Sequence, residues 1–339
     1  MTKLSVLTTI FNGEKYLKDM FESVFSQTFS DFEWIIVDDG STDNTWKKLK
    51  KYQKFDERIR LYKLDTNKGV GYANRFALSL AQGEYIAKVD VDDISKPKRF
   101  EKQVDVLNAQ PDIDVVDSYV EYFAADFDSE ISPRFCSMKN YYDNKVNKPW
   151  SSEEIAENLY WHCAVVNGAM MGRRKSIEFV GYSAKTKLAE DYLLFYKMNI
   201  SGMKFYKIRE NLVRIRISNE SLTARQFHLI SEANLNVKRF GLESFLKSDN
   251  RPIVIWGAGK KGKDTLLYIK KEFDIEPVLF FDSDKKKEGS YISGIEIVAP
   301  RNIEKYKILV ESSYGQEEII VYLKKYNCKP LLDYYVATE

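Results

Sequence analysis

The stretch YIAKVDVDD, residues 85–93, joins an apolar run of strand length to a cluster of three aspartates. Its first five residues have the composition of a buried strand, and the aspartates follow where that strand would end. Earlier in the chain, FEWIIVDDGST (residues 32–42) has the same arrangement, an apolar run followed by two aspartates and turn residues. A third apolar run, residues 4–10, has two threonines near its end. Three predicted strands thus end in acidic or small polar side chains.

Segments with apolar residues at helical spacing alternate with these runs. The predicted order is strand 4–10, a helix that includes Leu17–Phe25, strand 32–37, helix 45–52, strand 59–64, helix 71–81 and strand 85–89. Alternation at this spacing is typical of an α/β fold, with a mostly parallel sheet and helices on both of its faces.

The remaining pattern predicts a second domain. The first domain is completed by predicted helices at 99–108, 153–160 and 189–200, strands at 114–123, 204–208 and 212–217, and a long polar loop at 124–150. Ser248-Asp249-Asn250 then interrupts a predicted helix, and a new strand–helix rhythm begins. With 339 residues, at roughly 100–200 residues per domain, we expect a domain at 1–224, a connecting helix at 225–247 and a smaller α/β domain at 248–339.

The acidic strand ends predict a cation site. In open α/β sheets, ligands bind in the crevice at the carboxyl ends of the strands. Several carboxylates at one edge repel each other, so such a site normally holds a cation, and Mg²⁺ or Mn²⁺ suits carboxylate oxygens and substrate phosphates. Each cluster alone could be an ordinary turn or helix cap. Their occurrence at successive strand ends favours a metal-dependent nucleotide site.

Composition excludes several other classes of function. The net charge is only +2, which gives no basic footprint for nucleic acid. His162 and His228 are the only histidines, and the three cysteines have no paired spacing, so a multi-histidine metal site, a zinc ribbon and a disulfide framework are excluded. No apolar run approaches the roughly 20 residues that span a bilayer, and the N-terminus has no signal-peptide pattern. We therefore expect a cytoplasmic protein, with peripheral membrane association and homo-oligomer formation left open.

Three quoted stretches carry a family resemblance. SVLTTIFNGEKYL (5–17), QTFSDFEWIIVDDGSTDNT (27–45) and NKGVGYANRFALSLAQGEYIAKVDVDDISKPKR (67–99) resemble the family 2 glycosyltransferases with the GT-A fold. The closest variety makes bacterial capsular, exopolysaccharide and related surface glycans. The resemblance covers roughly the first 225 residues and implies an α/β GT-A fold for them.

The resemblance also implies a UDP-sugar site. Thr9 and Phe11 stand where family members line the uracil pocket, and an aromatic ring there can stack on the base. Asp39, with Asp38 beside it, matches the acid that accepts from the base N3–H, a donor that uracil has and cytosine lacks. Four further positions are expected at the donor or its metal: Asn67, Gly69, Asp90 and Asp92. Asp90 and Asp92 match the ends of the D-x-D motif, where the first faces the ribose and the second faces the Mg²⁺ or Mn²⁺.

Asp191 matches the family's general base. It follows the D-x-D motif by about 100 residues, as in the family, and would accept the proton of the acceptor hydroxyl. Without the resemblance, Glu190-Asp191 could simply be acids that favour the first turn of a helix. One departure concerns Ser218, which stands three residues before Ser221 where many members have a histidine that approaches the diphosphate. The chain therefore has no histidine at the position that is expected to approach the diphosphate.

The last 92 residues leave several roles open. Gly257-Ala258-Gly259-Lys260-Lys261-Gly262 follows a predicted strand and opens a predicted helix, and Asp282 comes 25 residues after Gly257. This is the context of a dinucleotide fingerprint, but the segment has about half the length of a full dinucleotide-binding domain. It resembles a small Rossmann-like module of some sugar acyltransferases. A structural or protein-contacting role, nucleotide or nucleotide-sugar binding, and redox use of NAD all remain open.

Together these features predict an inverting, metal-dependent glycosyltransferase of hexosyl or N-acetylhexosaminyl type. It would move sugar from a UDP-sugar to a glycan or lipid-linked saccharide during bacterial surface polysaccharide synthesis. One alternative is a sugar nucleotidyltransferase, although Thr8–Asn12 does not supply the basic glycine-rich loop typical of that class. Another is a scaffold that binds nucleotide-sugar without turnover, which the intact Asp90, Asp92 and Asp191 argue against.

Overall fold

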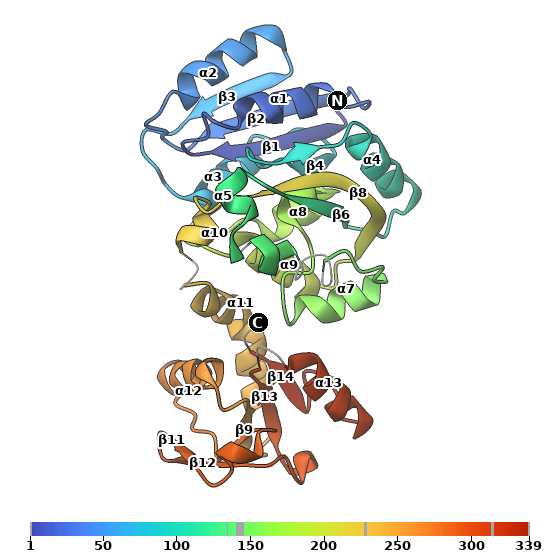
Figure 1. Cartoon of the computed structure of the whole chain (residues 1–339). Helices are drawn as coiled ribbons and strands as arrows, with labels where there is room; N and C mark the ends of the chain where they lie inside the picture. The colour runs from blue at the N-terminus through green and yellow to red at the C-terminus, as the bar shows by residue number, and fades with distance from the viewer. Residues whose placement is uncertain (1, 134, 140–145, 227–228, 313–314, 338–339) are drawn as a thin grey trace. The chain divides into compact units, whose positions relative to one another are not determined.

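The computed structural model of the chain describes residues 2–133, 135–139, 146–226, 229–312 and 315–337 (Figure 1). It divides into two compact units: residues 1–159 with 163–230, and residues 160–162 with 231–339. The helix predicted as a connection is α11 (Ile230–Lys247), which clusters with the second unit, and His228 lies outside the described residues. Within the described ranges, every helix is too short or too polar to cross a bilayer.

The first unit is built on one mixed sheet with the strand order β3-β2-β1-β4-β7-β6-β8-β5. The strands are β1 (Leu4–Ile10), β2 (Phe32–Asp38), β3 (Ile59–Lys63), β4 (Tyr85–Lys88), β5 (Ile94–Ser95), β6 (Val115–Ala124), β7 (Met171–Arg173) and β8 (Phe205–Ile217). The pairs β1–β2, β2–β3, β1–β4 and β6–β8 are parallel, whereas β7 and β5 pair antiparallel to their neighbours. The parallel arrangement predicted for the first four strands is confirmed, and all four direct their carboxyl ends to one edge.

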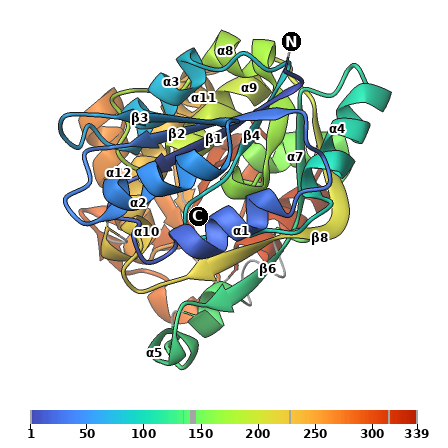
Figure 2. The same ribbon diagram turned by 90° about the horizontal axis from the view of Figure 1, so that it is seen from above.

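Helices cover both faces of this sheet because each has one apolar side. They are α1 (Leu17–Phe25), α2 (Thr45–Tyr52), α3 (Val70–Ser79), α4 (Arg99–Ala109), α5 (Phe127–Glu130), α7 (Ser152–Leu159), α8 (Arg174–Val180), α9 (Glu190–Ile200) and α10 (Leu222–Arg225). Leu17, Met20, Phe21 and Val24 of α1 are fully buried and share one core cluster with Leu49 of α2. A second cluster joins α3, α8 and α9 to the other face of the strands. In Figure 2, α1 and α2 lie in front of β1 and β2.

Two sequence predictions need correction. The strands expected at 204–208 and 212–217 are one continuous strand, β8, which pairs with β6 through an irregularity around Tyr119. The exposed residues of β8 near this irregularity, including Arg209 and Glu210, interrupt its apolar pattern. The segment 124–150 is not a loop throughout, because α5 and residues 135–139 are helical, while residues 134 and 140–145 are outside the described ranges.

The second unit has a six-stranded sheet with the order β11-β12-β10-β9-β13-β14. Its elements after α11 are β9 (Ile253–Trp256), α12 (Lys260–Phe273), β10 (Leu279–Phe281), β11 (Tyr291–Ile292), β12 (Ile295–Val298), β13 (Lys307–Val310), α13 (Gln316–Lys325) and β14 (Tyr334–Val336). All pairs are parallel except β11–β12. Parallel strands joined by helices bring the ends of β9, β10, β12 and β13 to one edge, as in other doubly wound sheets.

Candidate active site

The end of β2 holds a rigid acidic turn. Asp38 is fully buried, and one of its carboxylate oxygens accepts the Ser41 N–H at 2.8 Å. Asp39 accepts the N–H groups of Lys68 at 2.7 Å and Gly69 at 2.9 Å, which fixes its carboxylate against the start of α3. Burial, together with the charge of Asp38, raises the pKa of Asp39. The carboxylate of Asp39 therefore has a fixed direction but retains acceptor capacity for a ligand N–H.

The turn also explains two other predicted residues. Asn67 accepts the Gly69 N–H at 3.0 Å, so it shapes the loop that holds Asp39. Gly69 has φ of +91°, and the space where a side chain would start is open. Gly40 has φ of +73°, and an added Cβ would meet the Thr66 carbonyl carbon at 2.5 Å, so only glycine fits there.

A polar chain crosses from β1 to α9. The Thr9 hydroxyl donates to the Asn74 side-chain oxygen at 3.0 Å. The Asn74 amide in turn donates to Glu190 at 3.5 Å. Asn74 is 1% exposed, so its two bonds satisfy a buried side chain. Thr9 therefore lies close to the candidate site, and Asn74, which the sequence analysis did not select, connects it to the helix that carries Asp191.

The D-x-D motif follows β4, and its acids are crowded. Lys88, whose side chain is 1% exposed, forms an ion pair with Asp90 at 3.0 Å. An added Cβ at Gly168 would meet carboxylate oxygens of both Asp90 and Asp93, at 2.9 and 2.7 Å. Those two carboxylates therefore face one small space that a larger residue at 168 would fill.

Burial and repulsion between carboxylates raise the pKa values of Asp92 and Asp93. Burial and the charge of Asp90 raise the pKa of Asp92 to about 6. Burial and the charges of Asp92 and Asp90 raise the pKa of Asp93 well above its ordinary value. Asp93 accepts the Arg216 N–H at 3.0 Å, and the Arg216 side chain donates to the Asp92 carbonyl at 2.9 Å. Backbone and arginine contacts thus hold the motif while its carboxylates remain incompletely neutralised.

Asp191 lies in the first turn of α9, where acids favour the helix dipole. Burial is the main cause that raises its pKa, and the charge of Asp90 adds to the effect. Burial and the charge of Asp191 raise the pKa of neighbouring Glu190 to about 8. At neutral pH, Glu190 therefore holds its proton. The charge of Asp90 acts on Asp191, so the D-x-D motif and the predicted base share one electrostatic environment.

Phe11 and Ser218 complete the predicted set. Phe11 follows β1 and is 47% exposed, so one ring face is available to a planar ligand. Ser218 is 4% exposed and accepts the Glu220 N–H at 3.0 Å, which is the role of a turn residue.

Sequence reasoning missed Lys88 and Tyr182. Lys88 could have been noticed as a charge inside an apolar strand, two residues before an acid. Tyr182 has a buried hydroxyl with no hydrogen-bond partner among the described residues, and the charges of Glu190, Asp90 and Asp191 add to burial in raising its pKa.

The site fits a divalent cation only with help from a substrate. Within the described ranges, no three His, Cys, Asp or Glu side chains are arranged to hold a metal ion. Mg²⁺ and Mn²⁺, however, are often held by one or two carboxylates together with substrate phosphates. The raised pKa of Asp92 indicates a carboxylate that a cation would stabilise. Asp92 is therefore a suitable single protein ligand for such an ion.

Comparison with known proteins finds a matching family model in each unit. Residues 5–181 match the family described as Glycosyl transferase family 2, and residues 249–328 match the family described as C2185-like, N-terminal. The chain is 34% identical over 215 residues to an uncharacterized glycosyltransferase, MJ1057, of Methanocaldococcus jannaschii, covering 63% of this chain and 70% of that one. It is 42% identical over 104 residues to the putative teichuronic acid biosynthesis glycosyltransferase TuaG of Bacillus subtilis, covering 31% of this chain and 41% of that one.

Solved structures agree in fold. S. aureus TarS 1-349 in complex with UDP-GlcNAc has a TM-score of 0.56 and 19% identity, over 81% of this chain and 73% of that one. The mannosyltransferase PcManGT from Pyrobaculum calidifontis, in complex with GDP-Man and Mn²⁺, has a TM-score of 0.54 and 17% identity, over 70% and 64% of the two chains. The α/β GT-A fold predicted for the first unit is confirmed.

Proposed function

The chain belongs to glycosyltransferase family 2, and we propose that it is an inverting, metal-dependent enzyme that uses a UDP-sugar. Its acceptor would be a saccharide or lipid-linked glycan in surface polysaccharide synthesis at the cytoplasmic face of the membrane. The observation that carries the proposal is that Asp90, at the end of β4, is near enough to both Asp92 and Asp191 for its charge to help raise their pKa values, while Thr9 and Asn74 connect β1 to the helix that carries Asp191. The relative named for teichuronic acid biosynthesis supports the acceptor class.

Two residues would recognise the uracil. The exposed ring of Phe11 can stack on the base, since stacking needs only a ring face. Asp39, held by two backbone N–H groups, would accept the uracil N3–H. Thr9 and Asn67 would shape this pocket through their bonds to Asn74 and Gly69. Asp90 would face the ribose, and Asp92 would hold the cation.

Asp191 would act as the general base. The proton of the acceptor hydroxyl passes to the Asp191 carboxylate while the acceptor oxygen bonds to the anomeric carbon. The bond from that carbon to the diphosphate oxygen breaks with its electron pair, and UDP leaves. A raised pKa makes Asp191 a stronger base than an ordinary aspartate. A divalent cation bound at Asp92 would neutralise charge that develops on the departing diphosphate.

Asp191→Asn tests the base assignment. The change keeps the shape and removes the proton acceptor, so transfer should fall by about 10³-fold, within the range of general base catalysis. UDP-sugar affinity should change by less than about threefold, because the base does not contact the donor nucleotide. UDP release and isothermal titration calorimetry measure the two quantities separately. A panel of UDP- and GDP-sugars in the same assay would identify the donor.

The matched control is Asp112→Asn, which removes an exposed acid paired with Lys204 at 3.0 Å. It should leave both quantities unchanged. Normal transfer by Asp191→Asn would contradict the base assignment, and a preference for a GDP-sugar would contradict the uracil pocket.

A further inference from the structure

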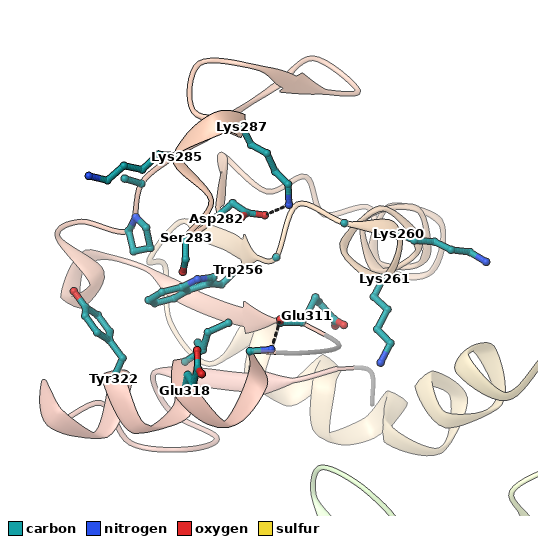
Figure 3. Close-up of a pocket in the computed structure, with 17 residues that line it drawn as sticks. Trp256, Lys260, Lys261, Asp282, Ser283, Lys285, Lys287, Glu311, Glu318 and Tyr322 are labelled. Carbon is teal, nitrogen blue, oxygen red and sulfur yellow. Dashed lines mark hydrogen bonds and ion pairs between the residues drawn. The ribbon is translucent and has the colours of Figure 1, made fainter. Parts of the chain in front are cut away.

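A second strand-end site lies entirely within the second unit. A cavity of about 780 Å³ opens at the ends of β9, β10, β12 and β13, which is within the usual range for small-molecule pockets. Figure 3 shows Lys285, Lys287, Asp282 and Trp256 around it, with Lys260 and Lys261 on the α12 side. Nothing in the proposed transfer reaction uses this cavity.

The loop before α12 is shaped for close approach by a ligand. Gly257 has φ of +130°, and an added Cβ would overlap the Glu311 carbonyl oxygen. A Cβ on Gly262 would overlap the Gly257 carbonyl oxygen, so α12 packs directly on the end of β9. At Gly259 the same position has nothing within 4 Å. Two glycines are therefore required by packing, and the third leaves an open space beside the backbone.

That open space lies at the N-terminus of a 14-residue helix. Gly259 is the N-cap of α12 and supplies no side-chain cap. The first backbone N–H groups of a helix and its dipole favour a phosphate at this position. The cavity is lined by four lysines (Lys260, Lys261, Lys285 and Lys287) and three acids (Asp282, Glu311 and Glu318), so its lining has a small excess of positive charge.

Trp256 places a buried, unsatisfied donor beside the cavity. Its side chain is 3% exposed, yet its indole N–H has no hydrogen-bond partner among the described residues. Unsatisfied buried donors are rare and costly in native structures. Trp256 is one of the residues that line the cavity in Figure 3, and its indole nitrogen is covered by the surrounding protein. The Tyr322 ring lies edge-on to it at 5.4 Å, so the cavity also offers aromatic surface.

Asp282 argues against a dinucleotide. In dinucleotide sites, an acid at this strand end binds the ribose hydroxyls. Here one Asp282 oxygen accepts the Ala258 N–H at 2.9 Å and the Lys287 ammonium at 2.8 Å, and the other accepts the Asp284 N–H at 2.9 Å. The carboxylate is thus occupied in bracing the glycine loop, and the unit has only about half the length of a dinucleotide-binding domain.

We propose that this cavity binds a nucleoside diphosphate, with its phosphates at the N-terminus of α12 and its base or ribose against Trp256 and Tyr322. The site is separate from the donor site of the proposed function. Each glycosyltransferase chain would then have two nucleotide sites, each within its own unit.

Gly259→Asp tests this proposal in the full chain. The new carboxylate would occupy the open space and repel phosphate, so affinity there should fall at least about tenfold. Gly259→Asn is the matched control, because it has the same shape without the charge and should retain affinity within about threefold. Asp and Asn both cap helices well, so neither change should unfold α12. Circular dichroism and the thermal midpoint verify this.

The probes are ADP, UDP, pyrophosphate and NAD, titrated by calorimetry into each variant. We expect an ADP-binding event that Gly259→Asp removes and Gly259→Asn retains, with pyrophosphate at least about tenfold weaker because it cannot contact the aromatic rings. UDP should lose one of two binding events in Gly259→Asp. Equal ADP affinity in wild type and Gly259→Asp would overturn the proposal, as would pyrophosphate that binds as tightly as ADP or NAD that binds more tightly. Loss of transfer in Asp191→Asn does not bear on this result, so the two proposals can fail separately.

Discussion

Both units place the carboxyl ends of parallel strands at one edge, and the two edges have opposite chemistry. In the first unit, Asp92 follows β4 and its pKa is raised to about 6 by burial and by the charge of Asp90. In the second unit, burial alone would raise the pKa of Asp282, but bonds from Lys287 and from backbone N–H groups outweigh it and lower the pKa. One edge therefore has acids that are only partly compensated, and the other has an acid paired with Lys287 and one more lysine than acids in its cavity lining.

This difference shows that the strand topology determines where a site lies, whereas its side chains determine the charge of the ligand that it would bind. The first edge has more carboxylates than Lys88 and Arg216 compensate, and it would gain stability from a cation. The second edge offers N–H groups and ammonium groups and would gain stability from an anion. Both edges also depend on glycines that no side chain can replace, Gly40 at the first and Gly257 and Gly262 at the second.

The largest expected effect is on the cation dependence of the first edge. Asp92→Asn keeps the shape and removes the proposed metal ligand, so transfer should fall by about 10²- to 10³-fold. Mn²⁺ should strengthen UDP-sugar binding in the wild type and not in the variant. Calorimetry with Mn²⁺ and with EDTA measures both affinities.

The second edge supplies the control for that experiment. ADP binding that depends on Gly259 should be the same in Mn²⁺ and in EDTA, because the second edge is expected to use lysines and a helix N-terminus. Unchanged UDP-sugar affinity in EDTA would remove the distinction between the two edges and contradict the role of Asp92.

A smaller effect, on stability, should show which glycines of the second edge are required by the backbone shape. Gly262→Ala forces a Cβ into the Gly257 carbonyl oxygen and should destabilise this unit by about 2–3 kcal/mol. Gly259→Ser adds a side chain where nothing lies within 4 Å, and a serine N-cap should be neutral or slightly stabilising. Differential scanning calorimetry of the full chain measures both changes. Equal unfolding temperatures for the two variants would show that the loop is more adaptable than its packing indicates.

Most of the first unit's fold could be predicted because its strands are buried runs of strand length. The four strands from β1 to β4 were recognised within a residue or two, because each is an uninterrupted apolar run followed by turn residues. β8 was divided in two because exposed Arg209 and Glu210 interrupt its apolar pattern. The apolar pattern of a sequence follows the burial of its side chains. An irregular strand pairing exposes some side chains without ending the strand.

The candidate site was predicted only where its residues follow strands or match a family motif. Asn74 was missed because it lies inside a helix, where the sequence pattern gives no partner for it. The contacts of Asn74 with Thr9 and Glu190 span 65 and 116 residues of sequence. Long-range polar pairs of this kind depend on the final packing, so a single sequence does not reveal them. The roles assigned to Asp39, Asp90 and Asp92 stay predictions until they are tested.

The smallest expected effect is a change of thermal stability with pH, which should have opposite sign at the two edges. The folded pKa of Glu190 is about 8, above its ordinary value of 4.5, so the folded state holds more protons than the unfolded state between these pH values. Its contribution is fully present below pH 4.5 and is lost as the pH rises to about 8. Glu190→Gln cannot lose a proton and should raise the thermal midpoint at pH 8.5, with little change at pH 4.5.

Asp282→Asn should behave in the opposite way. The folded pKa of Asp282 is below its ordinary value of 3.8, so its contribution is present above that value and is lost as the pH falls. The variant should therefore be less stable than the wild type at neutral and alkaline pH, and the difference should shrink as the pH falls below about 4. Thermal melts of both variants from pH 3 to 9 measure the two slopes. Slopes of the same sign would mean that the acids at the two edges are not in opposite environments, because only a raised pKa in one and a lowered pKa in the other yields opposite dependence.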